Sequence, residues 1–346
     1  MKALVYTAPN EIRLLDRPYP ALGEGEAIVR IEAVGICGSD MHAFHGRDPR
    51  RNPGLVLGHE FSGIVEASAD QTIKVGARVT GNPLIVCGQC EYCRQGRDNL
   101  CANRTMVGMT RPGAFAEYMG IPAAALIPVP NGLSLTKAAL TEPAATALHA
   151  VNLSMRSLVK SVGDCRVLIL GGGAIGLLCA LLLKTRGVTY LEIVEINPER
   201  QEKLRAIVGG IVRDPREAPV VESSVDYVID AVGSAATRKT AVGAIRPGGV
   251  IMHIGLQDWA SEIDMRKLTL SEITLLGSYT YSTADLHETV SALDRGEFGN
   301  LAWVETRPLA EGPTAFLDLH HARVSSAKIV LLPHGISFGK EGTPTC

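Results

Sequence analysis

At 346 residues, with 46% apolar residues, 20% charged residues and a formal net charge of −2, the chain has the composition of a globular protein long enough for two domains. The charge balance has no basic excess, which argues against nucleic acid or an anionic membrane as a partner. The N-terminal segment lacks the apolar run of a secretory signal, and glycines interrupt the most apolar stretch, so a cytoplasmic protein without a membrane span is expected.

Residues 1–145 are predicted to form a β-rich domain. Short apolar runs, among them KALVYT, EAIVRIEAVG and FSGIVEA, are separated by Gly and Pro, which is typical of strands joined by turns in a barrel. Residues 297–346 contain further short strands, notably AKIVLLP, and we expect them to return to this domain. Cys346, in the polar final segment, is not expected to bind metal.

A different rhythm, in which strands alternate with helices, predicts a second domain over residues 146–296. The apolar runs RVLIL, LEIVE, DYVIDAV, VIMHIG and ITLLGS, with the weaker GIVR at 210–213, give six strands separated by helical segments. Such βαβ units form a parallel, doubly wound sheet, so this domain is expected to be Rossmann-like and the chain to be of the α/β class.

The run RVLILGGGAIGLLC contains a glycine motif directly after a strand and at the start of a helix. Gly171, Gly173 and Gly176 have G-x-G-x-x-G spacing. The first permits a tight turn, the second lets a pyrophosphate approach the backbone, and the third lets the helix pack closely on the strand. Together with Ala174 and Ile175, these glycines are predicted to hold a dinucleotide at the helix N-terminus.

The end of the next strand bears on which dinucleotide binds. Glu195 lies 19 residues beyond Gly176, where a carboxylate can accept hydrogen bonds from the adenosine ribose. The same negative charge disfavours a 2′-phosphate, so NAD is expected over NADP. Arg200, shortly after this strand, is a cation that could weaken the preference.

Half of the eight cysteines fall within 15 residues: Cys87, Cys90, Cys93 and Cys101 follow the spacing C-x2-C-x2-C-x7-C. In a reducing compartment such a cluster indicates metal binding or catalysis instead of disulfides. Four thiolates suit tetrahedral zinc and leave no ligand position for water or substrate. We therefore predict a structural zinc lobe over residues 87–101, with an iron–sulfur cluster or redox thiols as the alternatives.

A second set of metal-ligand residues is spread more widely along the chain. The segments GICGSDMHAFHG and VLGHEFSG contain a thiol and an imidazole, which are good zinc ligands, and LTEPAATALHA offers a carboxylate as a third. Taken singly, each residue also fits an ordinary role in the core, in a turn or at a helix N-terminus. The candidates are Cys37, Ser39, His42, His59, Glu60 and Glu142.

In order and spacing, CGSDMH, GHEFSG, VGARV, the four-cysteine lobe and GGGAIG resemble the zinc-dependent medium-chain alcohol dehydrogenases over essentially the whole chain. The resemblance implies a GroES-like β-barrel domain with a catalytic zinc, a Rossmann domain with the nicotinamide cofactor, and a substrate cleft between them. Cys37 and His59 would hold the catalytic zinc, with Glu60 as an adjacent, intermittent ligand. Two zinc ions per chain and a homodimer or homotetramer are expected.

The third ligand separates two branches of this family. Simple alcohol dehydrogenases supply a cysteine, whereas Glu142 resembles the branch with sorbitol, polyol-phosphate and threonine dehydrogenases. The expected substrate is therefore a sugar alcohol, or its phosphate, whose secondary alcohol is oxidised to a ketose. Arg47, Arg50 and Arg51 are candidate phosphate ligands, although a solvated loop is the simpler interpretation. Whether Glu142 would bind zinc directly or through water stays open.

A proton relay completes the hypothesis. Ser39, two residues after Cys37, can hydrogen-bond the alkoxide, and His42 can pass the proton to solvent. A turn-capping serine and a surface histidine are the alternative interpretations.

Two other functions stay open for the whole protein: a threonine-type amino-alcohol or 2,3-diol dehydrogenase, and a crystallin-like protein that binds zinc and nucleotide without catalysis. An exchangeable zinc position argues against the latter.

Overall fold

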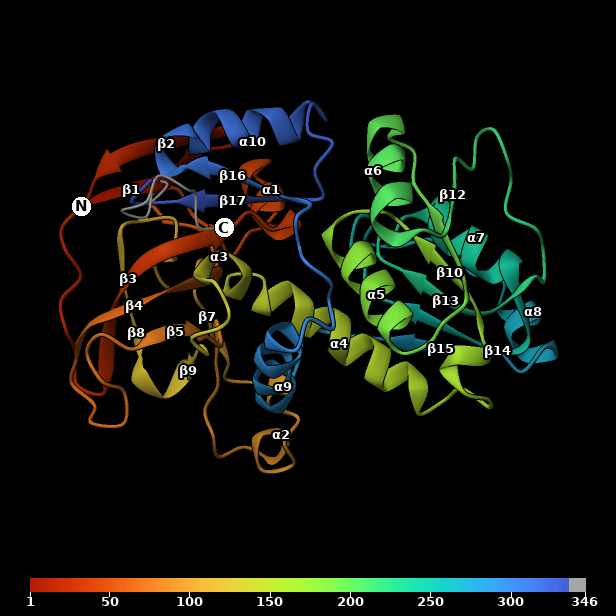
Figure 1. Cartoon of the computed structure of the whole chain (residues 1–346), viewed down its shortest axis with the longest axis horizontal. Helices are drawn as coiled ribbons and strands as arrows, with labels where there is room; N and C mark the ends of the chain where they lie inside the picture. Colours follow the sequence, from red (N-terminus) through yellow and green to blue (C-terminus); the bar gives the residue numbers. More distant parts are fainter. Residues whose placement is uncertain (336–346) are drawn as a thin grey trace.

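The computed structural model describes residues 1–335, and Cys346 lies outside this range. Two β-sheet units lie side by side, and helix α4 (Thr141–Met155) runs between them (Figure 1). This helix contacts strand β4 (Glu60–Ser68) of the first unit and helix α5 (Ala174–Thr185) of the second. Residues near the N-terminus of α4 are thus placed at the junction of the two units.

Within the described residues, the sheet of the first unit has seven strands in the order β16-β17-β3-β4-β5-β9, with β8 paired to β3. Only β16 and β17 pair in parallel, and the other pairs are antiparallel. The strands are β3 (Glu26–Gly35), β5 (Arg78–Gly81), β8 (Tyr118–Pro122), β9 (Leu126–Pro128), β16 (Val304–Pro308) and β17 (Lys328–Leu332), besides β4. The segment AKIVLLP therefore lies next to β3, far from it in sequence.

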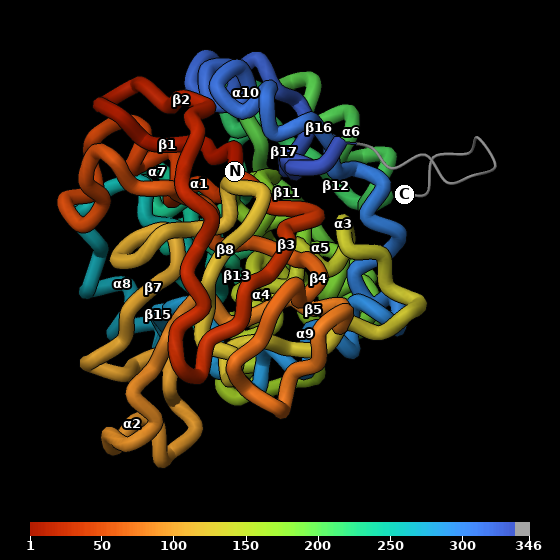
Figure 2. The backbone as a smooth tube through the Cα atoms, turned by 90° about the vertical axis from the view of Figure 1, so that its left-hand side faces the viewer, coloured from red at the N-terminus to blue at the C-terminus, as the bar shows by residue number. Residues whose placement is uncertain are grey.

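Smaller elements surround this sheet. Two hairpins pair antiparallel strands: β1 (Lys2–Ala8) with β2 (Glu11–Asp16), and β6 (Leu84–Ile85) with β7 (Thr105–Met106). The helices of this unit are α1 (Gly38–Phe44), α2 (Glu91–Arg94), α3 (Leu135–Ala138) and α10 (Gly312–His320). The loop that carries α2 projects from the rest of the molecule (Figure 2).

The second unit contains a six-stranded parallel sheet in the described part of the chain, with the order β12-β11-β10-β13-β14-β15. The strands are β10 (Arg166–Leu170), β11 (Tyr190–Val194), β12 (Ile211–Arg213), β13 (Val225–Asp230), β14 (Ile245–His253) and β15 (Thr274–Gly277). The chain order reverses on either side of β10, which is the switch point where doubly wound sheets bind ligands. The predicted doubly wound α/β fold is confirmed.

Helices cover both faces of this second sheet because alternate side chains of each strand point to opposite sides. Val167 and Ile169 of β10 pack with α4 and α5, whereas Leu168 and Leu170 pack with the helices on the other face. The remaining helices are α6 (Pro198–Val208), α7 (Ala235–Ala244), α8 (Met265–Leu270) and α9 (Thr283–Asp294), and α9 packs on α4. None of the helices in residues 1–335 is long and apolar enough to cross a membrane.

Candidate functional site

Cys37, His59 and Glu60 come together because strands β3 and β4 are paired. Gly35 at the end of β3 lies opposite Glu60 at the start of β4, so the turn after β3 brings Cys37 beside His59. One thiol, one imidazole nitrogen and one carboxylate oxygen lie within 4.8 Å of one another. Thiolate, imidazole and carboxylate are the ligands that zinc takes in proteins, so the group fits a zinc ion.

The imidazole of His59 is oriented by its neighbours. Its Nδ1 lies 3.5 Å from Asp40 Oδ1, and its Nε2 lies 3.4 Å from Ser39 Oγ. Zinc-bound histidines commonly turn their second ring nitrogen toward a carboxylate, which leaves Nε2 as the ligand atom here. Burial acts to lower the pKa of His59, but the charges of Asp40 and Cys37 hold it well above its usual range. The negative charges of Asp40 and Cys37 would also favour a metal cation at this position.

Glu60 forms a buried ion pair that the sequence did not indicate. Both of its carboxylate oxygens accept hydrogen bonds from Lys328 Nζ at 2.7 Å, and the same ammonium donates to Ile36 O at 3.0 Å. Burial acts to lower the pKa of Lys328, and Glu60 and Cys37 raise it above its usual value. A Cβ at Gly35 would lie 2.1 Å from Glu60 Oε2, so only glycine leaves room for this carboxylate. The only hint in the sequence was that Lys328 begins a strand, KIVLL, whose other residues are all apolar.

Glu142 lies in the first turn of α4, outside the 4.8 Å group formed by the other three residues. Its carboxyl is buried and accepts a hydrogen bond from Tyr281 Oη at 2.9 Å. Burial raises the pKa of Glu142 to about 7. Tyr281 follows β15 of the second unit, so a residue from each unit meets at this carboxyl.

Ser39 and His42 occupy the first two turns of α1, directly after Cys37. Ser39 Oγ accepts a hydrogen bond from Arg51 Nη2 at 3.2 Å. His42 is half-buried, and burial, followed by the charges of Arg47 and Arg51, lowers its pKa below the usual 6.5. A histidine that is neutral near neutral pH can accept a proton.

The three arginines considered as phosphate ligands have different environments. Arg51 is buried, and Arg50 Nε and Nη2 each bond a carboxylate oxygen of Asp48 at 2.9 Å. Arg47 is exposed. Two of the three guanidinium groups are therefore already engaged within the protein.

The glycine-rich turn lies between β10 and α5 at the switch point of the parallel sheet. Gly171 has φ of +98°, a conformation that favours glycine, and a Cβ at Gly176 would lie 1.9 Å from Gly171 O. A Cβ at Gly173 would meet nothing within 4 Å, so the start of α5, with Ala174 and Ile175 in its first turn, borders open space. Exposed backbone N–H groups at this N-terminus fit a pyrophosphate.

Glu195 connects this turn to the start of α6. Its carboxylate accepts hydrogen bonds from the backbone N–H groups of Gly172 at 3.1 Å, Ile196 at 2.7 Å and Asn197 at 2.8 Å. Arg200 Nη1 also lies 3.3 Å from Glu195 Oε2. The sequence placed Glu195 and Arg200 near the dinucleotide ribose, and the structure shows them paired beside the glycine turn.

The four cysteines of the lobe lie close enough to share one ion. Cys90 and Cys93 have sulfurs 3.5 Å apart, as do Cys87 and Cys101, and all four Sγ atoms lie within 4.8 Å of one another. Four convergent thiols fit a tetrahedral zinc with no open position. The lobe sits at a distance from Cys37 in the chain and forms a site of its own.

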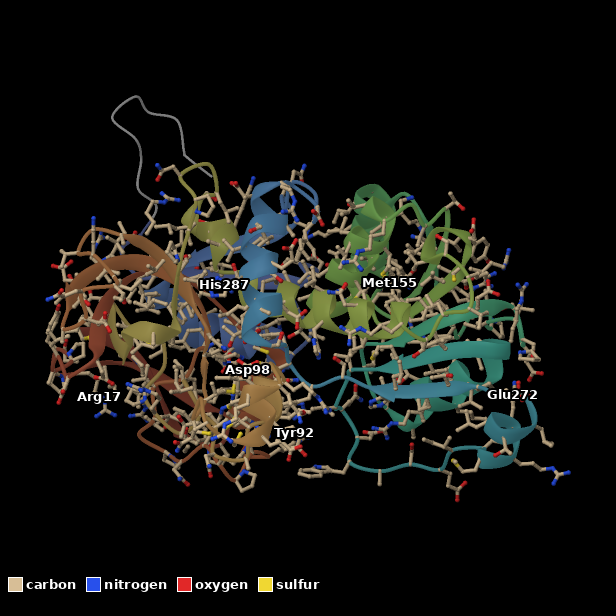
Figure 3. The ribbon with its side chains drawn as sticks, turned by 90° about the horizontal axis from the view of Figure 1, so that it is seen from below. Arg17, Tyr92, Asp98, Met155, Glu272 and His287 are labelled. Carbon is tan, nitrogen blue, oxygen red and sulfur yellow. The ribbon has the colours of Figure 1, made fainter. Side chains whose placement is uncertain are left out.

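The lobe also touches the segment that carries Tyr281. Asp98 accepts hydrogen bonds from the backbone N–H and hydroxyl of Thr283, and Asn99 Nδ2 donates to Tyr279 O at 2.8 Å. Figure 3 shows Asp98 between the lobe and helix α9. The cysteine lobe of the first unit thereby contacts the loop that leaves the sheet of the second.

Comparisons with known proteins agree with this arrangement. Residues 23–131 match the family "Alcohol dehydrogenase GroES-like domain", and residues 174–295 match the family "Zinc-binding dehydrogenase". An L-galactonate-5-dehydrogenase of Escherichia coli is 30% identical over 307 residues, covering 86% of this chain and 88% of that protein. An L-threonine 3-dehydrogenase of Chelativorans sp. is 30% identical over 341 residues, covering 94% and 92%.

Among solved structures, a zinc-binding dehydrogenase-type protein from Sinorhizobium meliloti bound to NADP superposes with a TM-score of 0.86 at 31% identity, over 96% of this chain and 99% of that one. The first family match covers most of the first unit, and the second covers most of the unit with the parallel sheet. The chain therefore belongs to the zinc-dependent medium-chain dehydrogenases, in the branch of polyol and threonine dehydrogenases, and is an oxidoreductase that uses zinc and a nicotinamide dinucleotide.

Proposed function

We propose that the protein transfers a hydride from a secondary alcohol of a polyol to NAD and gives a ketose. The observation that supports this most is the group of half-buried Cys37 and buried His59 and Glu60 beside Ser39, with the carboxyl of Glu142 close by in place of a further thiol. Zinc held there would act as a Lewis acid that lowers the pKa of the substrate hydroxyl.

The chain's own residues would supply the remaining steps. The Ser39 hydroxyl takes up the substrate proton while its own hydrogen moves on toward His42, and the lowered pKa of His42 keeps its ring available as the acceptor. Tyr281 and Lys328 hold the carboxylates of Glu142 and Glu60 in place. Cys87, Cys90, Cys93 and Cys101 would close around a second, structural zinc.

NAD is proposed as the dinucleotide because the carboxylate of Glu195 lies beside the glycine turn. Arg200 is within hydrogen-bonding distance of that carboxylate, and the Sinorhizobium meliloti relative was solved with NADP. Initial rates with each dinucleotide at equal concentration test the choice. The proposal requires a higher kcat/KM with NAD, and Arg200→Ala should widen that difference.

Two substrate classes compete for the site. L-galactonate-5-dehydrogenase acts, by its name, on a polyhydroxylated acid, whereas L-threonine 3-dehydrogenase acts on an amino alcohol. NADH formation across sugar alcohols, sugar acids, sugar-alcohol phosphates, 2,3-diols and threonine separates them. A clear preference for threonine would replace the polyol proposal, and failure on every compound would remove both.

The free polyol is favoured over its phosphate because Arg50 and Arg51 are occupied by Asp48. Equal or lower kcat/KM on the phosphate ester is therefore expected. A large preference for the phosphate would point to Arg47 or to groups elsewhere in the site.

We propose further that residues 1–145 and 297–346, of which 336–346 lie outside the described residues, form the GroES-like domain and residues 146–296 the Rossmann domain, in a cytoplasmic homo-oligomer. Strand β15 is the outer strand of its sheet, and exposed apolar side chains lie on it or in the segment of the chain that precedes it: Leu256, Trp259, Met265, Leu270 and Leu275. Such a patch commonly marks a protein interface. Light scattering would test it, and charged substitutions at Leu270 and Leu275 should give monomers.

A further inference from the structure

A buried guanidinium lies next to the candidate proton path, and no step above uses it. Arg51 follows α1 in a loop rich in charged residues, yet its side chain is fully buried. A buried arginine requires partners for its N–H groups, because desolvating an unpaired cation is strongly unfavourable. The groups that accept hydrogen bonds from Arg51 therefore indicate which residues it holds in position.

Arg51 makes hydrogen bonds in three directions. Nη1 donates to Ser39 O at 2.7 Å and to Asp48 Oδ2 at 3.1 Å, and Nη2 donates to Ser39 Oγ at 3.2 Å. Nε donates to Gly108 O at 3.1 Å, and Asp40 Oδ1 lies 3.9 Å from Nη2. The guanidinium thus donates hydrogen bonds to both the backbone carbonyl and the hydroxyl of Ser39. Its own position is fixed by hydrogen bonds to Asp48 and Gly108.

This contact restricts what the Ser39 hydroxyl can do. A serine hydroxyl has one hydrogen and two lone pairs, and a guanidinium can only donate. Arg51 occupies one lone pair, which leaves a single acceptor and a single donor on Ser39. A group with one acceptor and one donor can take a proton from the substrate only as it releases its own in the other direction.

The charge of Arg51 also acts on His42, one turn further along α1. Burial is the largest influence that lowers the pKa of His42, followed by Arg47 and Arg51, while Asp48 opposes them. His45, the next histidine on this segment, has its own pKa lowered by burial and by His320, Arg47 and His42. Loss of the cation at Arg51 would therefore raise the pKa of His42.

We propose that Arg51 is a positioning residue for substrate deprotonation, which orients the Ser39 hydroxyl and keeps His42 ready to accept the proton. In the step, the substrate O–H bond breaks as its proton goes to Ser39 Oγ, and the Ser39 hydrogen passes on toward His42 and solvent. The hydride goes to the nicotinamide. This inference rests on the proposed dehydrogenase function.

Two substitutions separate geometry from charge. Arg51→Lys keeps the positive charge but does not reproduce the contacts to Ser39 O, Ser39 Oγ and Gly108 O, because the three N–H donors of an ammonium share one nitrogen, whereas those of the guanidinium are spread over three. Arg51→Ala removes both. Arg50→Ala is the matched control, since Arg50 bonds the same Asp48 but is exposed and has no hydrogen bond to Ser39 among the described residues.

We expect Arg51→Lys and Arg51→Ala to lower kcat about ten- to hundredfold, the equivalent of one charge-assisted hydrogen bond, with little change in KM. The acidic limb of the pH–kcat profile should move to higher pH in Arg51→Ala and stay in place in Arg51→Lys. Added guanidinium ion should restore part of kcat to Arg51→Ala. Arg50→Ala should match the wild type in all three measurements.

The pKa of His42 can also be followed without substrate. Proton release on NAD binding, followed with an indicator dye, should have a higher midpoint pH in Arg51→Ala than in Arg51→Lys or the wild type. Melting temperature and zinc content show which variants are folded. If Arg51→Ala does not fold, the kcat of Arg51→Lys decides alone.

Wild-type kcat in folded Arg51→Lys, or lowered melting temperature as the sole effect of both variants, would overturn the role of Arg51 and leave it as a structural cation. Absence of turnover by the wild type on every compound tested would instead count against the proposed function. The two failures are therefore distinguishable.

Discussion

The two candidate zinc sites are built in opposite ways. The lobe draws all four of its thiols from 15 consecutive residues, and a helix of one turn, α2, carries one of them. The site at Cys37 and His59 is assembled from the β3–α1 turn, β4, the N-terminus of α4, the loop after β15 and the start of β17. Lys328 and Ile36, which share a hydrogen bond there, are 292 residues apart.

This difference relates to what each site does. Four thiolates from one short segment can surround an ion without help from the rest of the fold, and they close it to substrate. A zinc site that leaves one coordination position for substrate has only three protein ligands. Hydrogen bonds from neighbouring groups are needed to keep those ligands in the right orientation. Asp40 and Arg51, near Cys37 in sequence, supply that support together with Lys328 and Tyr281 from distant parts of the chain.

Cys37→Ser should have the largest effect on chemistry. Without the thiolate the open site should lose its zinc, and kcat should fall by at least about a thousandfold, since a Lewis acid contributes several kcal/mol to the transition state. The variant should keep the lobe zinc and a melting temperature near that of the wild type. Unchanged activity would place the chemistry elsewhere.

Cys90→Ser should show the opposite profile. Loss of the lobe zinc should lower the melting temperature by roughly 5 °C or more, because structural zinc contributes directly to folding. Folded molecules measured below the transition should keep most of their hydride transfer per occupied open site. Should the variant stay stable but lose all activity, the lobe would have the catalytic role.

Tyr281→Phe tests how much the open site depends on the support of Glu142. The substitution removes the hydrogen bond to Glu142 Oε1 and leaves a buried carboxyl without that partner, and it should lower kcat/KM about ten- to hundredfold. Tyr279→Phe is a suitable control, since the Tyr279 ring contacts Arg104 of the lobe side. Equal losses in both variants would mean that the loop, and not the carboxyl contact, matters.

The pH dependence of alcohol oxidation reports on His42. Its pKa is lowered from 6.5, and the ring accepts a proton only when neutral, so the rate should fall as pH decreases through a midpoint below 6.5. His42→Asn should slow oxidation mainly on the acidic side. A pH–rate profile identical to that of the wild type would exclude His42 from the relay.

Asp285 gives the smallest expected effect and concerns α9, whose first residue, Thr283, bonds Asp98 of the lobe. Burial acts to raise the pKa of Asp285, but hydrogen bonds from His149 and Ser282 outweigh it and lower the value to about 2. The resulting stabilisation is present above the unfolded pKa near 3.9 and is lost as pH falls toward 2. Asp285→Asn should therefore cost about 1 kcal/mol at pH 7 and less at pH 3, measured by urea unfolding.

Sequence pattern was sufficient for features set by local spacing. The six strands of the parallel sheet, the glycine turn and the proximity of the four cysteines could all be predicted, because each depends on residues that are near one another in the chain. The pairing of Cys37 with His59 as zinc ligands was implied by the family resemblance alone, since their separation in sequence does not imply contact, and the structure brings them together by pairing β3 with β4.

The supporting groups could not be predicted in the same way. Arg51 lies in a loop dense with charge, where solvent exposure is the ordinary expectation, and Lys328 opens a strand whose neighbours are far away in sequence. Their burial follows from tertiary packing: Arg51 bonds Ser39, 12 residues before it, and Gly108, 57 residues after it, and Lys328 bonds Glu60, 268 residues before it. Tyr281 contacts a carboxyl on an element 139 residues away.

Zinc stoichiometry measured together with activity shows whether the open site does the chemistry while the closed lobe supports the fold. Atomic absorption should find about two zinc ions per wild-type chain. A mild chelator should remove one of them, abolish turnover and leave the melting temperature nearly unchanged, and added zinc should restore activity. One zinc per chain, or activity that persists while only the lobe is occupied, would contradict the account.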